Sequence, residues 1–161
     1  RGIDDTSGDI SDTGDSPGYG DDNMNEDPQV IFEGKRLLLA EDILINREIA
    51  SMQLSSLGFV LEYAENGQEA VEMVTASEPG YYDAVLMDIQ MPIMNGYEAT
   101  EAIRALDNRE LSRLPIVAMT ANAFSEDVKK AHDAGMNAHV AKPINMDLLE
   151  SVLRDALSGR L

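Results

Sequence analysis

The feature that most constrains this chain is a strict alternation between short apolar runs and longer segments with helical periodicity. Five apolar runs of four or five residues occur between residues 36 and 141, and a segment of helical periodicity follows each one. A short apolar run without polar alternation is typical of a strand buried on both faces of a sheet. Five strand–helix units in sequence favour a parallel sheet with right-handed crossovers and helices on both faces. We therefore predict a doubly wound α/β domain.

The runs and the periodic segments also give residue ranges for these elements. The predicted strands are Arg36–Ala40, Val60–Ala64, Ala84–Asp88, Pro115–Met119 and Ala138–Ala141. The predicted helices are Ile45–Leu57, a segment between Gly67 and Pro79, Tyr97–Leu106, Ser125–Gly135 and Met146–Leu157. In the first helix, Ile45, Ile49 and Met52 fall on one face.

The first 33 residues differ in composition from the rest of the chain. They hold ten acidic residues and one arginine, a net charge of −9, which is half of the −18 of the whole chain. They carry few large apolar side chains, so they cannot bury enough surface to offset the entropy lost on ordering. We expect residues 1–33 to be a disordered acidic linker, with Val30, Ile31 and Phe32 able to pack on the domain edge. Residues 34–161 are expected to form the single folded domain.

The composition also argues against several functional classes. An acidic chain is a poor partner for nucleic acids and for anionic membrane surfaces, because both attract basic proteins. The chain has no cysteine, which excludes disulfides, thiolate catalysis and cysteine-based zinc sites. No apolar run approaches the ~20 residues of a membrane span. No signal peptide is visible, and the chain begins at Arg1 rather than Met, so we expect a piece of a longer protein.

Polar side chains stand at the ends of four predicted strands, and the carboxyl ends of parallel strands meet at one edge of the sheet. They are Glu41 and Asp42 after the first strand, Asp88 in the third, Thr120 after the fourth and Lys142 after the fifth. Taken singly, an acidic pair or a threonine is most often a helix cap, and a lone lysine is most often a solvated charge. Together they lie at the edge where open α/β sheets bind their ligands.

Three carboxylates at this edge would repel one another, and oxygen ligands in that number suit a hard divalent cation. Mg²⁺ is favoured because it takes few carboxylates and leaves room for a phosphate oxygen, and Mn²⁺ is the alternative ion. Lys142 adds a fixed positive charge and Thr120 a hydrogen-bond donor. A metal, an ammonium and a hydroxyl around one carboxylate are what phosphoryl transfer needs. We predict that Asp88 is a nucleophile that becomes an acyl phosphate.

Five short motifs resemble the receiver domain of two-component response regulators. They are Leu38-Leu39-Ala40-Glu41-Asp42, Met87-Asp88-Ile89-Gln90-Met91-Pro92, Met94-Asn95-Gly96, Thr120-Ala121-Asn122-Ala123 and Lys142-Pro143. The match runs from about Arg36 to Leu157, and its wording is similar to receivers fused to hybrid sensor histidine kinases. The resemblance implies a flavodoxin-like (βα)5 three-layer sandwich with strand order 2-1-3-4-5.

The resemblance also implies a role for each matching residue. Asp88 would be the phosphoacceptor, and the Mg²⁺ ligands would be Glu41, Asp42, Asp88 and the backbone carbonyl of Gln90. Thr120 and Lys142 would each contact a phosphoryl oxygen, and the Lys142–Pro143 peptide bond would be cis. Thr120 and His139 would form the switch pair, although His139 stands where the family usually has Tyr or Phe.

The implied function is that of a phosphorelay receiver. The donor would be the phosphohistidine of a kinase domain, and a helical histidine phosphotransfer protein would be the donor or the recipient. The domain would catalyse only its own phosphorylation and dephosphorylation, while transferase activity would belong to a parent histidine kinase. We expect a cytoplasmic monomer without direct membrane contact, in a parent that could be membrane-anchored. Because only Ser158-Gly159-Arg160-Leu161 follow the last predicted helix, we expect no DNA-binding output domain.

Other functional readings remain open at this point. An aspartyl-phosphate hydrolase of the dehalogenase type would place a second Asp two residues after the nucleophile, where this chain has Gln90. The chain could also be the receiver of a response regulator whose output domain has been removed. A receiver that binds partners without phosphorylation is disfavoured by the complete set of site residues. A nucleotide or flavin binder is disfavoured because no glycine-rich phosphate-binding motif occurs.

Overall fold

A computed structural model of the chain describes residues 32–121 and 125–161. The strands are β1 (Arg36–Ala40), β2 (Val60–Ala64), β3 (Ala84–Asp88), β4 (Ile116–Thr120) and β5 (Ala138–Ala141). The helices are α3 (Leu44–Ser55), α4 (Gly67–Ala76), α5 (Gly96–Arg104), α6 (Arg109–Ser112), α7 (Ser125–Ala134) and α8 (Met146–Leu157). Each predicted strand is confirmed to within one residue. The central strands β1, β3 and β4 are almost entirely buried, as a short apolar run in a parallel sheet predicts.

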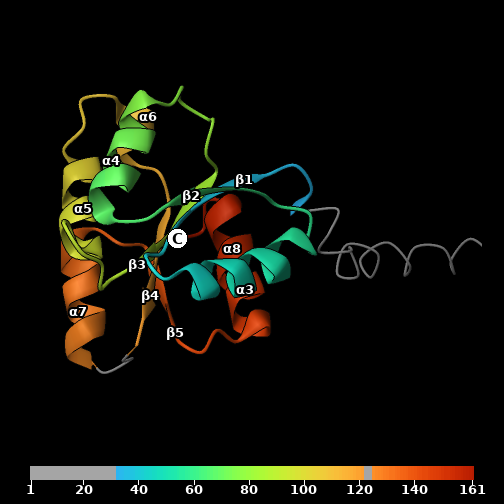
Figure 1. Cartoon of the computed structure of the whole chain (residues 1–161). Coiled ribbons are helices and arrows are strands. Elements are labelled where there is room, and N and C mark those ends of the chain that lie inside the picture. Colours follow the sequence, from blue (N-terminus) through green and yellow to red (C-terminus); the bar gives the residue numbers. More distant parts are fainter. Residues whose placement is uncertain (1–31, 122–124) are drawn as a thin grey trace, which may run out of the picture.

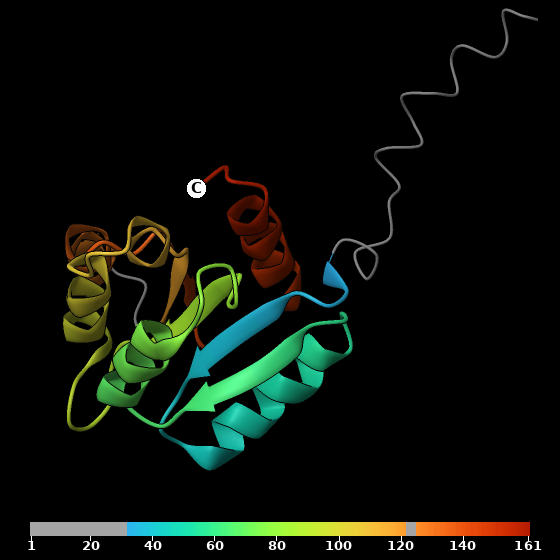
Figure 2. The same cartoon turned by 90° about the horizontal axis from the view of Figure 1, so that it is seen from above.

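The five strands form one parallel sheet in the order β2-β1-β3-β4-β5. Helices α4, α5 and α7 cover one face, and α3 and α8 cover the other, so the fold has three layers (Figures 1 and 2). This confirms the predicted doubly wound, flavodoxin-like fold. The strand order reverses between β1 and β3, and the crevice outside the carboxyl ends of such strands is where open α/β sheets bind ligands.

Alternating side chains of each central strand supply two separate hydrophobic cores. In β1, Leu38 and Ala40 pack beneath α4, α5 and α7, whereas Leu37 and Leu39 pack beneath α3 and α8. All four side chains are fully buried. Burying each of the three leucine side chains contributes roughly 1.5–3 kcal/mol. The two cores therefore fix which residue ends each strand at the carboxyl edge.

Helix α3 packs on the sheet through a different face from the one that its large aliphatic residues occupy. Ile45, Ile49 and Met52 are 57%, 51% and 74% exposed. Leu54 is fully buried instead, and Ala50 packs beside it. Residues 50, 54 and 57 repeat at the same helical spacing as residues 45, 49 and 52, so periodicity alone could not choose between the two stripes.

Two local features extend the predicted organisation. The short helix α6 was not predicted, although Asn108 caps it by accepting hydrogen bonds from the N–H groups of Glu110 and Leu111 at 2.9 and 3.1 Å. Phe32 is fully buried and stacks on Phe59 with ring centroids 4.7 Å apart, so this residue, two positions before the predicted domain boundary, packs on the domain. The rest of the predicted linker, residues 1–31, lies outside the described residues.

Among the helices that the structure describes, none has the length and apolar character needed to cross a membrane.

Candidate phosphoacceptor and metal site

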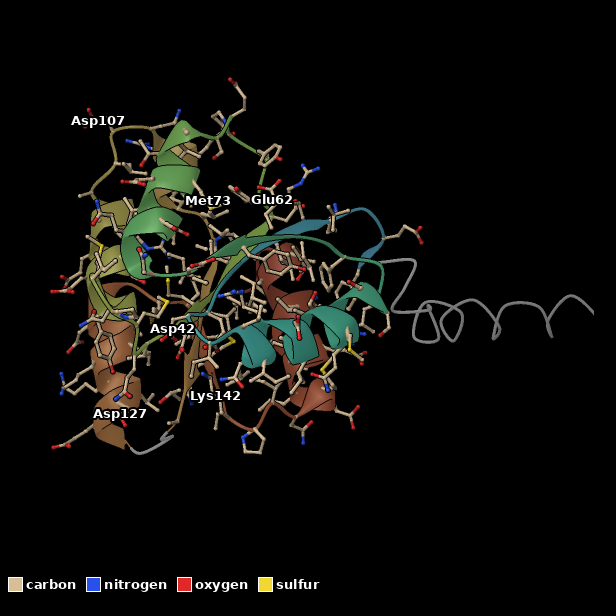
Figure 3. All side chains as sticks on the ribbon, viewed as in Figure 1. Asp42, Glu62, Met73, Asp107, Asp127 and Lys142 are labelled. Carbon is tan, nitrogen blue, oxygen red and sulfur yellow. The ribbon has the colours of Figure 1, made fainter. Side chains whose placement is uncertain are left out.

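The carboxyl edge of the sheet brings the predicted site residues together. Strand β1 ends at Ala40, so Glu41 and Asp42 begin the next loop, while Asp88 is the last residue of the neighbouring strand β3. One carboxylate oxygen from each of these three acids lies within 4.8 Å of the others. Glu41 and Asp88 are only 2% and 6% exposed. Figure 3 shows Asp42 and Lys142 at this same edge of the molecule.

Lys142 connects two of these carboxylates from the other side of the site. Its Nζ lies 2.9 Å from Glu41 Oε1 and 3.2 Å from Asp88 Oδ2. The N–H of Lys142 donates to the Thr120 carbonyl at 2.8 Å, which fixes the start of the loop after β5. The following peptide bond, between Lys142 and Pro143, is cis. The ammonium thus points toward the acids, although 101 residues separate it from Glu41.

The close charges move the pKa values of the three groups in different directions. Burial raises the pKa of Asp88 to about 6, and the neighbouring Glu41 charge adds to this rise. Burial also acts on Glu41, but the hydrogen bonds from Lys142 and from the Ile43 N–H hold the pKa of Glu41 below its usual range. Burial opposes the charge of Lys142, yet both carboxylates raise its pKa above its ordinary value. Asp88 is therefore the carboxylate that most needs an additional positive charge.

Asp42 supplies the observation that bears most directly on metal binding. Its Oδ1 atom is buried and has no hydrogen-bond partner among the described residues. A buried carboxylate oxygen without a partner is costly, and a cation is the natural partner for it. Three oxygen ligands from Glu41, Asp42 and Asp88 suit Mg²⁺ better than softer metals. The residues therefore fit a hard divalent cation.

Two of the three acids, Asp42 and Asp88, line a cavity of about 710 Å³. Asp42, Asp88, Gln90, Thr120 and Lys142 all line this cavity, so four loops contribute to it. Thr120 is 5% exposed and ends strand β4. A cavity of this size accommodates a phosphoryl group together with part of the molecule that delivers it.

Three cavity residues were not singled out from the sequence. They are Tyr97, Asp127 and Lys130, which line the side of the cavity formed by α5 and α7. Figure 3 shows Asp127 on α7. Burial raises the pKa of Tyr97, and the charge of Asp127 adds to this rise. The sequence prediction considered residues at strand ends, so it missed these three residues, which lie on helices. Only the spacing of residues 127 and 130, which places them on one helical face, could have indicated that they act together.

Two glycines set the shape of the loop that follows Asp88. A Cβ atom on Gly96 would lie 2.4 Å from the Asp88 carbonyl oxygen, and one on Gly67 would lie 2.3 Å from the Met94 carbonyl oxygen. The Gly96 N–H donates to the Ile89 carbonyl at 2.8 Å, and the Gly67 N–H donates to the Met94 carbonyl at 2.9 Å. Only glycine permits these approaches, so the loop is held against both β3 and α4.

Gln90 and His139, two further residues with implied roles, lie in different parts of the structure. Gln90 is exposed and lines the cavity, two residues beyond Asp88. His139 lies half-buried in β5, where it pairs with Ala118 of β4. The described residues that line the cavity do not include His139.

Residues 37–154 match the family model for the response regulator receiver domain. Among curated proteins, the chain is 37% identical over 140 residues to "Probable histidine kinase 2" of Oryza sativa subsp. indica, covering 80% of this chain and 13% of that protein. It is 39% identical over 121 residues to "Hybrid signal transduction histidine kinase I" of Dictyostelium discoideum, covering 74% of this chain and 7% of that protein. The chain thus spans only a small part of these relatives.

Two solved structures resemble the chain in both fold and sequence. One is the receiver domain of a Pseudomonas aeruginosa sensor histidine kinase with a magnesium ion coordinated in its active-site cleft. Its TM-score is 0.70 at 37% identity, and the match covers 78% of this chain and 98% of that one. The other is the receiver domain of the Saccharomyces cerevisiae response regulator Ssk1, crystallised with the histidine phosphotransfer protein Ypd1. Its TM-score is 0.71 at 29% identity, with coverage of 79% and 91%.

Proposed function

Because this chain belongs to the response regulator receiver domain family, we propose that Asp88 is its phosphoacceptor and takes a phosphoryl group from a phosphohistidine. The observation that carries the proposal is the approach of Lys142 Nζ to both Asp88 and Glu41, at 3.2 and 2.9 Å, beside the orphaned Asp42 oxygen. Charges of opposite sign that converge on one buried carboxylate suit the transfer of an anionic group to that carboxylate.

The transfer exchanges one bond to phosphorus for another. An Asp88 carboxylate oxygen attacks the phosphorus atom, the P–N bond to the donor imidazole breaks, and the bonding electron pair returns to the imidazole nitrogen. Negative charge spreads over the three remaining phosphoryl oxygens as this happens. Lys142 is positioned to pair with one of these oxygens, and the Thr120 hydroxyl to donate a hydrogen bond to another. The product is an aspartyl phosphate.

The acids Glu41, Asp42 and Asp88 and the backbone carbonyl of Gln90 would hold Mg²⁺. The bound ion would supply positive charge that offsets both the carboxylates and the incoming phosphoryl oxygens. The raised pKa of Asp88 gives a reason for this requirement, because the buried carboxylate must be ionised to act as a nucleophile. Mn²⁺ has the same ligand preferences and is the expected substitute.

The same reasoning extends to the switch residues and the cellular setting. In our proposal, Thr120 moves toward a phosphoryl oxygen and His139 turns inward, which alters the surface formed by α7, β5 and α8. The partners are a kinase phosphohistidine domain and a helical histidine phosphotransfer protein; the similar yeast receiver domain was crystallised with a histidine phosphotransfer protein. We propose that the domain is a cytoplasmic monomer within a hybrid histidine kinase, and that the kinase activity belongs to other parts of that protein.

A labelling experiment with acetyl phosphate tests the phosphoacceptor role. The wild-type chain is expected to take up one phosphoryl group per molecule when Mg²⁺ is present and none in excess chelator. Asp88→Asn is expected to remain unlabelled, while Asp107→Asn, an exposed acid away from the cavity, labels normally. Catalytic turnover of many phosphate esters would instead identify a hydrolase and contradict the proposal.

The switch is tested separately by NMR of the Mg²⁺-loaded chain with beryllofluoride, a mimic of the phosphoryl group. Chemical-shift changes are expected in α7, β5 and α8 as well as in the loops around Asp88. Changes confined to those loops would show that the site is not coupled to the distant surface.

A further inference from the structure

An unusual backbone conformation lies in the loop beside the Asp88 cavity. Ile93 has a φ of 71°, and it is the only non-glycine residue with positive φ in the described part of the chain. A β-branched side chain is strongly disfavoured there, because its Cβ crowds the neighbouring carbonyl oxygen. The Met94 N–H donates to the Pro92 carbonyl at 2.7 Å, which closes a γ-turn centred on Ile93.

The surrounding loop holds this strained turn from both sides. The Met94 carbonyl accepts the Gly67 N–H at 2.9 Å, and the Ile89 carbonyl accepts the Gly96 N–H at 2.8 Å. The turn is therefore fixed to α4 on one side and to the end of β3 on the other. Strained conformations persist where their surroundings over-determine them, and they concentrate at functional sites.

The Ile93 side chain buries little surface against the domain that could offset this strain. It is 76% exposed, more than any other large hydrophobic side chain in the described part of the chain. Its neighbours Met91 and Pro92 line the Asp88 cavity, as does Ile43, which is 49% exposed on the adjacent loop after β1. Exposed aliphatic side chains thus flank the cavity on two neighbouring loops.

We propose that Ile93 is an apolar contact residue for the protein that carries the phosphohistidine, with Ile43 as its counterpart on the adjacent loop. This inference rests on the proposed function. Asp88 is only 6% exposed, so the donor imidazole must enter the cavity, and the protein that bears it must then cover the surrounding loops. A partner with an apolar surface beside its histidine would bury both side chains, whereas a small donor such as acetyl phosphate would reach neither.

Replacement of Ile93 by asparagine separates this role from a structural one. Asparagine tolerates positive φ, so Ile93→Asn is expected to raise the urea midpoint of unfolding. Labelling by acetyl phosphate should be unchanged. The rate of phosphoryl transfer from the phosphorylated yeast phosphotransfer protein to Ile93→Asn, measured at concentrations below saturation, should fall about tenfold. Ile93→Val keeps the β-branched apolar side chain and should transfer within about twofold of wild type.

The control is Val60→Thr, which alters another exposed aliphatic residue, 41% exposed, at the amino end of β2 and away from the cavity. It should leave both labelling reactions unchanged. Unchanged transfer to Ile93→Asn would overturn the inference, and so would an equal loss of acetyl phosphate labelling. If acetyl phosphate labels the wild-type chain but the yeast protein does not, the partner class is wrong. The inference about Ile93 then fails, while the phosphoacceptor role of Asp88 stands. If neither donor labels the wild-type chain, the proposed function fails.

Discussion

At the scale of single residues, the site depends on an unequal sharing of charge among Asp88, Glu41 and Lys142. Lys142 contacts both carboxylates, but the pKa of Glu41 is lowered whereas that of Asp88 is raised to about 6. Glu41 also accepts the Ile43 N–H at 3.2 Å, so its ionised form has an additional donor. Asp88 is thus left as the carboxylate whose ionisation is stabilised least by the protein and most by an added cation or by phosphorylation.

This inequality predicts a pH-dependent effect of Asp88→Asn on stability in metal-free buffer. The folded-state pKa of about 6 lies above the ordinary value of 3.8, so wild-type stability falls as the pH rises from about 4 to about 6 and stays lower above it. The variant lacks this penalty and should be more stable by about 3 kcal/mol at pH 8, but by only about 0.5 kcal/mol at pH 4.

Urea unfolding of both proteins at the two pH values measures this difference. Adding Mg²⁺ at pH 8 should reverse the order, because the ion stabilises only the wild-type site. An equal effect of the substitution at pH 4 and pH 8 would show that burial does not perturb Asp88.

At the scale of secondary-structure elements, strands were predictable but helix faces were not. The buried runs Arg36–Ala40 and Ala84–Asp88 could form only central strands, so the convergence of Glu41, Asp42 and Asp88 followed from the sequence. Helix α3 carries two apolar stripes, and only its packing against the sheet distinguishes the buried one. Cavity residues contributed by helices α5 and α7 were likewise beyond the sequence, because their placement depends on how each helix is rotated on the sheet.

The two stripes of α3 predict opposite outcomes for substitutions on one helix. Leu54→Ala removes a fully buried side chain and should cost about 3 kcal/mol of folding free energy. Ile49→Gln changes a side chain that is 51% exposed and should alter stability by less than about 0.5 kcal/mol. Urea denaturation of both variants tests this, and a larger loss for Ile49→Gln would mean that α3 is rotated from its observed position.

At the scale of the whole molecule, Arg104 joins segments whose contact could not be predicted from the sequence. Its guanidinium donates to the carbonyls of Gly135, Ser112 and Leu114 at 2.9, 2.8 and 2.8 Å, and to Asn137 Oδ1 at 2.8 Å. Burial lowers the pKa of Arg104. Backbone carbonyl acceptors cannot be identified from a sequence, so the sequence does not distinguish this half-buried arginine at the end of α5 from a solvated charge.

This junction predicts that Arg104→Met destabilises the domain, although the acceptors that the structure describes for Arg104 are neutral oxygen atoms rather than carboxylates. The carbonyls of Gly135, Ser112 and Leu114 would lose the guanidinium donor, while Asn137 Oδ1 would keep the Ile116 N–H, at a total cost of about 3 kcal/mol. Arg113→Met replaces an exposed arginine after α6 and should change stability by less than about 0.5 kcal/mol. Equal urea midpoints for the two variants would show that the contacts of Arg104 contribute nothing to folding.

The identity of the residue that carries the phosphoryl group tests the central claim most directly. An aspartyl phosphate is an acyl phosphate, which borohydride reduces to the alcohol, so a phosphorylated aspartate becomes homoserine and can be located by peptide mass spectrometry. After acetyl phosphate and Mg²⁺ treatment, homoserine is predicted at position 88 and at no other aspartate. Homoserine at position 42, or unmodified Asp88 in a labelled chain, would contradict the account.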